Sequence, residues 1–297
     1  MPVRLSSAMR ALRPKQWTKN AVVFAAFVFA LGDPGQHVGW GQLWTTVAAA
    51  ALFCLVSSAI YLVNDVRDVR QDREHPTKRF RPIAAGELGA PAALAMAAML
   101  LGGGMGTAAW LNRPLFTVLA GYVVVQLFYT FALKRIALVD LFMIAGGFVL
   151  RALAGAVAID ADISPWLLLC AMLLALFLAL CKRRHEKVVL NDAGGRTRES
   201  LAQYDERLLD QLIAMVGAAT LVCYALYTLW PDTVQKFGTR LLGLTIPFVI
   251  FGLFRYLDLV YRHEKGGHPE VILLTDLPLL ADLALYGLTV LVILVAK

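Results

Sequence analysis

Long apolar segments divide this chain, and they limit its possible fold more than any other feature. Nine such segments, most of them near the length that crosses a bilayer, lie at residues 16–32, 43–63, 91–111, 115–133, 138–158, 165–181, 208–230, 241–261 and 277–296. Hydrophobic residues make up 59% of the 297 residues and charged residues only 16%, too few charges for the surface of a soluble domain of this size. The sequence therefore predicts an all-α, polytopic membrane protein of about nine transmembrane helices, in one domain covering residues 1–297.

Basic residues concentrate in alternate connections between these segments. Of the 28 Lys and Arg residues, 23 fall in connections on one side of the predicted membrane. The positive-inside rule places that side and the N-terminus in the cytosol, and the C-terminus outside. The net charge of +7 is thereby explained by topology, so it does not indicate nucleic-acid binding. The basic N-terminus has no separate short apolar core with a cleavage site, so we do not expect a removed signal peptide.

Oxygen-bearing side chains cluster where the second apolar segment ends. Asp65, Asp68 and Asp72 share one face of a helix at i, i+3 and i+7, and Asn64 and Asp68 share a neighbouring face. Carboxylate and amide oxygens suit Mg²⁺, which keeps some water ligands and also binds substrate phosphates. We therefore predict that these four residues bind Mg²⁺ and a diphosphate. The alternative is a solvated helix end with balanced charges.

A basic run follows the acidic cluster. Lys78, Arg79 and Arg81 lie between Pro76 and Pro82, which stiffen the segment. We predict that the three cations bind phosphate oxygens that the metal does not reach. The alternative is that they only mark the cytosolic side of the membrane.

A second charged group lies at the end of the sixth segment. Lys182, Arg183 and Glu186 belong to the run KRRHEK, and Arg198 and Tyr204 follow in the next connection. We predict that these five residues bind a phosphate-rich substrate, with Tyr204 donating to a sugar hydroxyl or a phosphate oxygen. The alternative is a positive-inside cluster whose long side chains reach the membrane surface. The His-Glu pair is not a zinc motif, because the second histidine of HExxH is missing.

Two further groups are candidates for substrate binding. Arg151 lies about 20 Å into the fifth segment at 1.5 Å per residue, where a charge is costly and must face the bundle interior. We expect it to line a site, or else to pair with Asp140. Near the N-terminus, Lys15, Lys19 and Asn20 surround a tryptophan, which fits either phosphate binding or an interfacial anchor. The four cysteines show no metal-ligand spacing, and we expect them to be packing residues.

These motifs resemble the UbiA superfamily of intramembrane prenyltransferases over nearly the whole chain. The resemblance runs from RPKQWTKN through NDVRDVRQD to the last apolar segment. Within the superfamily the chain is most similar to the decaprenyl-phosphate phosphoribosyltransferase branch, through NDVRDVRQDREHPTKRFRPIAAG, KRRHEK and FRYLDLV with GGHPEVILLTDLPLL. Such a resemblance implies a helical bundle around a central cavity, in a bacterial plasma membrane. It also implies active-site loops on the cytosolic side near residues 64–90, 182–207 and 262–276.

The resemblance also implies a reaction. A Mg²⁺-dependent membrane glycosyltransferase of cell-wall biosynthesis would transfer 5-phosphoribosyl from phosphoribosyl diphosphate to a polyprenyl phosphate and release diphosphate. The implied catalytic residues are Asp65, Asp68, Asp72 and Lys78. The second acidic motif typical of the superfamily, DxxxD, is absent, because Asp205 and Asp210 are one residue too far apart. A single acidic motif among many cations suits a donor with an additional phosphate.

Three alternatives remain open from the sequence. The first is transfer of a polyprenyl group from its diphosphate to an aromatic acceptor, which an intact second DxxxD would favour. The second is transport of a phosphorylated or lipidic anion, and the third is a scaffold without catalysis. A homo-oligomer is compatible with each of them.

Overall fold

A computed structural model describes residues 5–162, 164–192, 203–263, 266–267 and 269–295. The α-helices are α1 (Leu5–Ala11), α2 (Phe24–Ala30), α3 (Trp40–Arg67), α4 (Val69–Glu74), α5 (Ala90–Leu111), α6 (Arg113–Phe131), α7 (Val139–Ala158), α8 (Pro165–Asp192), α10 (Glu206–Leu229), α11 (Pro231–Phe237), α12 (Ile246–Tyr261), α13 (Pro269–Thr275) and α14 (Leu277–Val295). Short 3₁₀ helices are η1 (Pro14–Val23), η2 (Lys78–Phe80), η3 (Leu133–Arg135) and η4 (Leu241–Thr245). Within these residues the regular secondary structure is helical, as the long apolar segments predict.

Eight helical segments in the described residues are long and apolar enough to cross a membrane. They coincide with the second to ninth predicted segments. The first predicted segment, 16–32, is different, because it consists of η1 followed by the short helix α2. Its backbone lies against α7 so closely that a Cβ atom added at Gly155 would be 1.9 Å from the carbonyl oxygen of Val23. The first of the nine expected spans is therefore a broken helix, and eight continuous spans remain among the described residues.

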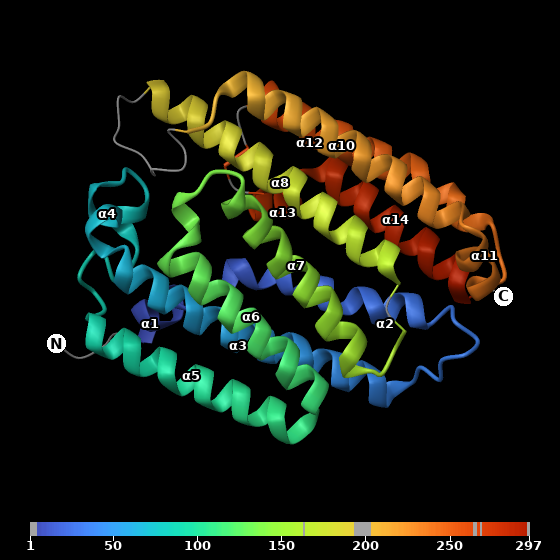
Figure 1. The fold of residues 1–297 in the computed structure, drawn as a ribbon, viewed down its shortest axis with the longest axis horizontal. Coiled ribbons are helices and arrows are strands. Elements are labelled where there is room, and N and C mark those ends of the chain that lie inside the picture. Colours follow the sequence, from blue (N-terminus) through green and yellow to red (C-terminus); the bar gives the residue numbers. More distant parts are fainter. Residues whose placement is uncertain (1–4, 163, 193–202, 264–265, 268, 296–297) are drawn as a thin grey trace.

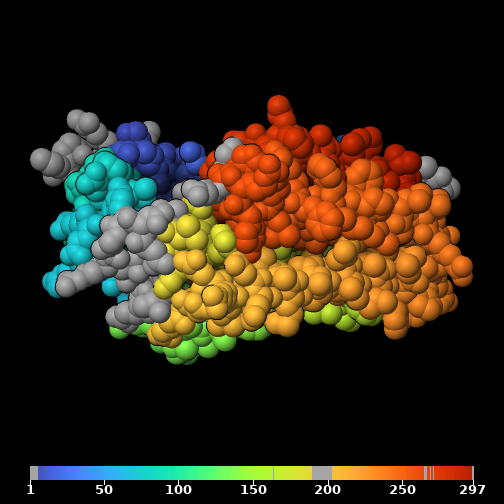
Figure 2. Space-filling model, turned by 90° about the horizontal axis from the view of Figure 1, so that it is seen from above, coloured from blue at the N-terminus to red at the C-terminus, as the bar shows by residue number. Residues whose placement is uncertain are grey.

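The long helices form two groups that meet at α7 (Figure 1). On one side α3, α5 and α6 pack together, and on the other α8, α10, α12 and α14 do so. Helix α7 contacts α3 and α6 in the first group and α8 in the second. Figure 2 shows α10 and α12 side by side on the surface of the second group. Two main clusters of buried apolar side chains follow the same division, one centred on Phe177 and the other on Phe53.

One end of the bundle collects the segments predicted to carry the chemistry. The end of α3, the helix α4, the connection from α6 to α7 and the end of α8 all lie at the left of Figure 1. The connections from α2 to α3, from α5 to α6 and from α7 to α8 lie at the opposite end. Residues far apart in the sequence therefore meet at one end, which we call the charged end.

Candidate active site

The acidic cluster lies where α3 gives way to α4. Helix α3 ends at Arg67 and α4 begins at Val69, with Asp68 between them at φ −91° and ψ 7°. The continuous helical face expected for the three aspartates is therefore interrupted at its middle member. Asp65 and Asp72 are nevertheless both buried, with 2% and 5% of their surface exposed.

Arg81 brings these two buried carboxylates together. Its Nη1 atom donates to Oδ1 of Asp65 at 3.1 Å and to Oδ2 of Asp72 at 2.7 Å. Hydrogen bonds of this kind, between a charged donor and charged acceptors, are stronger than bonds between neutral groups. The predicted basic run therefore does contact the predicted acidic cluster, through its third member.

Two more cations, from distant parts of the chain, bind the same cluster. Arg13 donates to Asp65, and its guanidinium lies 5.1 Å from the centre of the Tyr61 ring. Burial lowers the pKa of Arg13, and the neighbouring Asp65 opposes that shift. Lys134, buried between α6 and α7, forms an ion pair with Asp68. Each of the three aspartates is thus paired with a cation.

Asn64 supplies a further oxygen beside this cluster. Its Oδ1 atom is buried and has no hydrogen-bond partner in the described part of the chain, and a buried orphan acceptor calls for an explanation such as a bound ion. No group of three His, Cys, Asp or Glu side chains among the described residues is arranged to hold a metal ion. Asp68 is paired with Lys134, whereas Asp65 and Asp72 share Arg81. The side-chain oxygens of the three aspartates and Asn64 are the ligand type that a divalent cation prefers. For Asp68 to bind such an ion, its ion pair with Lys134 must break.

The rest of the basic run lies on the turn after α4. Lys78 is partly buried, whereas Arg79 is exposed, with its guanidinium 4.8 Å from the centre of the Phe80 ring. Nδ1 of His75 accepts a hydrogen bond from the backbone N–H of Thr77 at 3.2 Å. Burial, together with the charge of Lys78, lowers the pKa of His75, which favours the neutral ring that this bond requires.

The second predicted centre is built around Arg183. Its Nε atom donates to Oδ2 of Asp140 at 3.0 Å, and its Nη1 to Oε2 of Glu186 at 2.6 Å. The Tyr204 hydroxyl donates to Oδ1 of Asp140 at 2.9 Å and accepts from the backbone N–H of Leu138 at 2.6 Å. Burial raises the pKa of Tyr204. Arg183 and Tyr204 thus anchor the start of α7, and substrate binding by either of them stays a prediction.

The remaining predicted cations are more dispersed. Lys182 is partly buried on α8, and in η1 Lys15 is exposed and Lys19 partly buried. Arg198 lies outside the described residues. The predicted roles of Lys15, Lys19, Lys182 and Arg198 in substrate binding stay predictions.

Within the part of the chain that the structure describes, the hydrogen-bond partners of Arg151 include no carboxylate. Its guanidinium donates to Oδ1 of Asn20 at 2.7 Å, to the carbonyl of Gly147 at 2.8 Å and to the Tyr122 hydroxyl at 3.0 Å. Three aromatic rings surround it within 5.6 Å, those of Phe53, Tyr122 and Phe148. The pairing with Asp140 considered from the sequence does not occur, since Asp140 binds Arg183. Asn20 and Arg151 contact each other, although they are 131 residues apart.

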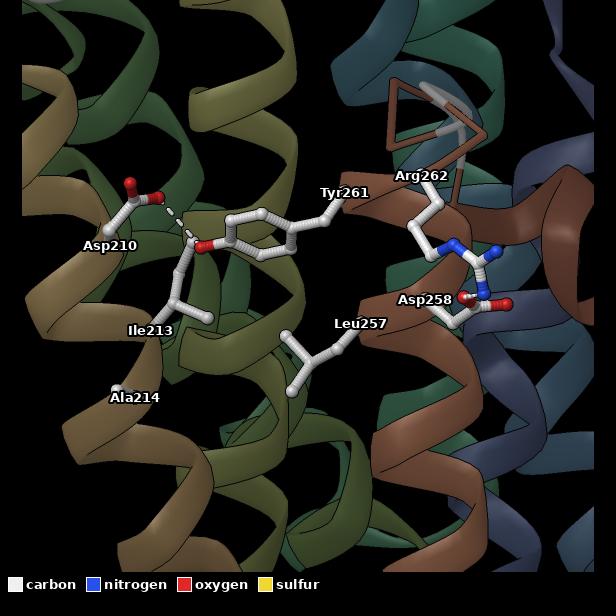
Figure 3. A pocket seen from close by; sticks show the side chains of 7 residues that line it. All are labelled: Asp210, Ile213, Ala214, Leu257, Asp258, Tyr261 and Arg262. Carbon is white, nitrogen blue, oxygen red and sulfur yellow. Dashed lines mark hydrogen bonds and ion pairs between the residues drawn. The ribbon is translucent and has the colours of Figure 1, made fainter.

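A cavity of about 320 Å³ opens between α10 and α12, separate from the acidic cluster (Figure 3). It is lined by Asp210, Ile213, Ala214, Leu257, Asp258, Tyr261 and Arg262. The Tyr261 hydroxyl reaches across it to Oδ1 of Asp210 at 2.6 Å, and Arg184 donates to the same oxygen at 2.6 Å. The Arg184 guanidinium is also 3.9 Å from the centre of the Tyr261 ring. This contact joins α8, α10 and α12.

Three residues in these clusters were not predicted as site residues. Arg13, Lys134 and Asp140 each contribute an ion pair at the charged end. The first two could be suspected only as members of basic connections. Asp140 had a clearer signal, because it is a carboxylate near the edge of an apolar segment.

Comparison with known proteins places this geometry in context. Residues 21–268 match the model of the UbiA prenyltransferase family. The decaprenyl-phosphate phosphoribosyltransferase of Mycolicibacterium smegmatis is 38% identical over 280 residues, which cover 92% of this chain and 87% of the relative. That of Corynebacterium glutamicum is 38% identical over 283 residues, covering 93% and 83%. A UbiA homologue from Archaeoglobus fulgidus, solved with GPP and Mg²⁺, has a similar fold at TM-score 0.73 and 18% identity, covering 98% of this chain and 100% of the homologue.

Proposed function

Because this chain belongs to the UbiA prenyltransferase family, we propose that it transfers 5-phosphoribosyl from phosphoribosyl diphosphate to a polyprenyl phosphate such as decaprenyl phosphate. The observation that carries the proposal is 38% identity over about nine-tenths of the chain to enzymes named for this reaction. The clustered carboxylates and cations at the charged end support it, because both substrates are phosphate esters. Diphosphate is the leaving group.

The chain is a multi-pass membrane protein. We propose the bacterial plasma membrane as its location, with the charged end in the cytosol, because the basic connections gather there. A polyprenyl tail would then remain in the bilayer while its phosphate reaches the charged end. The water-soluble donor would arrive from the cytosol.

Asn64, Asp65, Asp68 and Asp72 are the proposed ligands for Mg²⁺. These four side chains would hold the ion beside the donor's diphosphate, and the chemistry that it would supply is stabilisation of the negative charge on the leaving group. Support comes from the orphan Oδ1 atom of Asn64 and from the convergence of Asp65 and Asp72 on a single cation.

Cations of this chain would hold the two anionic substrates close together. Arg81, released from its carboxylates when the donor binds, would move to a phosphate oxygen, with Lys78 and Arg79 beside it. Further phosphate and sugar contacts are proposed for Lys15, Lys19, Lys182, Arg183, Glu186, Arg198 and Tyr204. For Asn20 and Arg151, which bind each other inside the bundle, the contacts favour a structural role instead. Preorganised cations of this kind stabilise charge in the transition state without reorganisation of solvent.

The reaction needs no strong general base. An oxygen of the polyprenyl phosphate attacks C1 of the ribose, and the bond from C1 to the diphosphate oxygen breaks. Because the attacking phosphate is already anionic, no proton has to be removed first. This agrees with the acidic cluster, where each of the three aspartates is paired with a cation.

The test is transfer by the purified chain in liposomes that contain decaprenyl phosphate and Mg²⁺. Phosphoribosyl diphosphate labelled in the ribose should yield a labelled lipid, and EDTA should abolish the product. A parallel reaction with geranyl diphosphate and an aromatic acceptor tests the prenyl-transfer alternative. Label that accumulates inside the vesicles without lipid product would favour a transporter and refute the proposal.

A further inference from the structure

Two cysteines from different helices lie in contact inside the bundle. Sγ of Cys170 on α8 is 3.4 Å from Sγ of Cys223 on α10, although 53 residues separate them in the sequence. Cys170 is five residues from the start of α8, and Cys223 six residues from the end of α10. Both therefore lie near the end of the bundle opposite the charged end.

The two thiols differ in exposure. Cys223 is buried at 5% exposure, whereas Cys170 is partly exposed. Beside them, at the helix ends, the rings of Trp166 and Trp230 are 5.2 Å apart. An oxidant could thus reach Cys170 first, with Cys223 already in place as its partner. The other two cysteines differ, since Cys54 contacts Asn20 and Cys181 is fully buried on α8.

We propose that Cys170 and Cys223 form a modification site, a dithiol that is oxidised to a disulfide between α8 and α10. The sulfur atoms, now 3.4 Å apart, must approach by about 1.3 Å to reach the usual bond length near 2.05 Å. A structural zinc ion usually takes four ligands. The two sulfurs fall short of that set, and the described residues contain no group of three metal-binding side chains.

The oxidant that suits this position is a two-electron acceptor dissolved in the membrane, such as a quinone. Each thiol loses its hydrogen and one S–S bond forms, while the quinone takes up two electrons and two protons and becomes a quinol. Under the topology proposed above, the pair lies near the outer face, where disulfides persist. The juxtaposition of the two thiols does not depend on the proposed activity.

The bond would join the two helices whose other ends hold the Arg184–Asp210 ion pair. Oxidation would therefore connect α8 and α10 at both ends. Because the closed loop is long, the disulfide should resist separation of the two helices and raise the unfolding temperature by several degrees.

The test uses the full chain in nanodiscs, with all four native cysteines. Diamide, which accepts two electrons and two protons, is added, free thiols are blocked with N-ethylmaleimide, and peptides are mapped by mass spectrometry. Cys170 and Cys223 should lose reactivity together, roughly tenfold or more faster than Cys54 and Cys181, and should appear as one linked peptide pair. Reduction should restore both thiols and lower the unfolding temperature.

Matched variants assign the bond. Cys170→Ser and Cys223→Ser should each abolish the linked peptide and the rise in unfolding temperature, whereas Cys54→Ser and Cys181→Ser should retain both. If Cys170 and Cys223 stay as reactive as Cys54 in the native chain, the proposal is overturned, even where a variant does not fold. Linkage between any other pair of cysteines would also overturn it.

Discussion

Two regions of this protein bury charged side chains, and the partners of those side chains differ in kind. At the charged end Arg81 binds two carboxylates, and Lys134 binds a third. In the span formed by α7, Arg151 binds only neutral oxygens and lies among aromatic rings.

This difference indicates which charged side chains can exchange their partner for a metal ion or a substrate. A carboxylate that pairs with a side-chain cation can accept a metal ion instead, and the released cation can bind phosphate. A guanidinium held by an amide, a carbonyl and a hydroxyl has no anion to exchange, so its bonds fix the positions of the helices. We therefore expect substitutions at the charged end to impair turnover and substitutions around Arg151 to impair stability.

The largest expected effect is on catalysis. Asp72→Asn keeps the shape of the side chain but removes a charge that binds Arg81 and the proposed Mg²⁺. We expect kcat to fall by roughly 10² to 10³-fold, with little change in the unfolding temperature in detergent. Asp232→Asn, at an exposed carboxylate on α11, is the control and should retain full activity. Undiminished turnover by the Asp72 variant would contradict the proposal that Asp72 binds Mg²⁺.

Arg151→Gln tests whether the hydrogen bonds of Arg151 stabilise the bundle. It leaves Asn20, Gly147 and Tyr122 with fewer partners inside the bundle, and we expect a loss of roughly 3 kcal/mol in stability. The measurement is thermal unfolding in detergent, beside the exposed control Arg113→Gln. A variant that remains stable yet loses its affinity for substrate would instead assign Arg151 to the substrate site.

Lys134→Gln tests whether Lys134 and Mg²⁺ compete for Asp68. Without its lysine partner, Asp68 is available to the metal, so the half-saturating Mg²⁺ concentration should fall by about fivefold, equivalent to about 1 kcal/mol. Calorimetric titration of Mg²⁺ against the variant and against Arg240→Gln measures this directly. Weaker binding would show that Lys134 holds Asp68 in its metal-binding position rather than competing with the ion.

The smallest effect is expected at the cavity between α10 and α12. Tyr261→Phe removes one hydrogen bond to Asp210, whose side chain is 42% exposed, and should cost about 1 kcal/mol or less. Tyr204→Phe should cost more, because it leaves both the buried carboxylate of Asp140 and the N–H of Leu138 without that hydroxyl. Comparison of the two unfolding temperatures checks this order, and equal losses would contradict it.

The members of the acidic cluster could be predicted from neighbouring residues, but their contacts with distant residues could not. Asn64, Asp65, Asp68 and Asp72 stand within nine residues, so helical spacing was enough to group them. The break at Asp68 was missed because helical spacing carries no sign of it, and the partner of Asp68 in the structure, Lys134, lies 66 residues away. The first membrane segment was predicted as a continuous helix because its composition hides the close approach of its backbone to Gly155.

The sequence by itself determined the approximate positions of the eight long apolar helices, the family and the location of the acidic cluster. These follow from hydrophobic length and local spacing, which are properties of neighbouring residues. Only the tertiary structure decided which cation pairs with which carboxylate, that Arg151 binds Asn20 and Tyr122 rather than Asp140, and that Cys170 contacts Cys223. Those outcomes depend on how helices distant in the chain pack, and the energy of a buried charge or thiol is set by the groups that packing brings within a few ångströms.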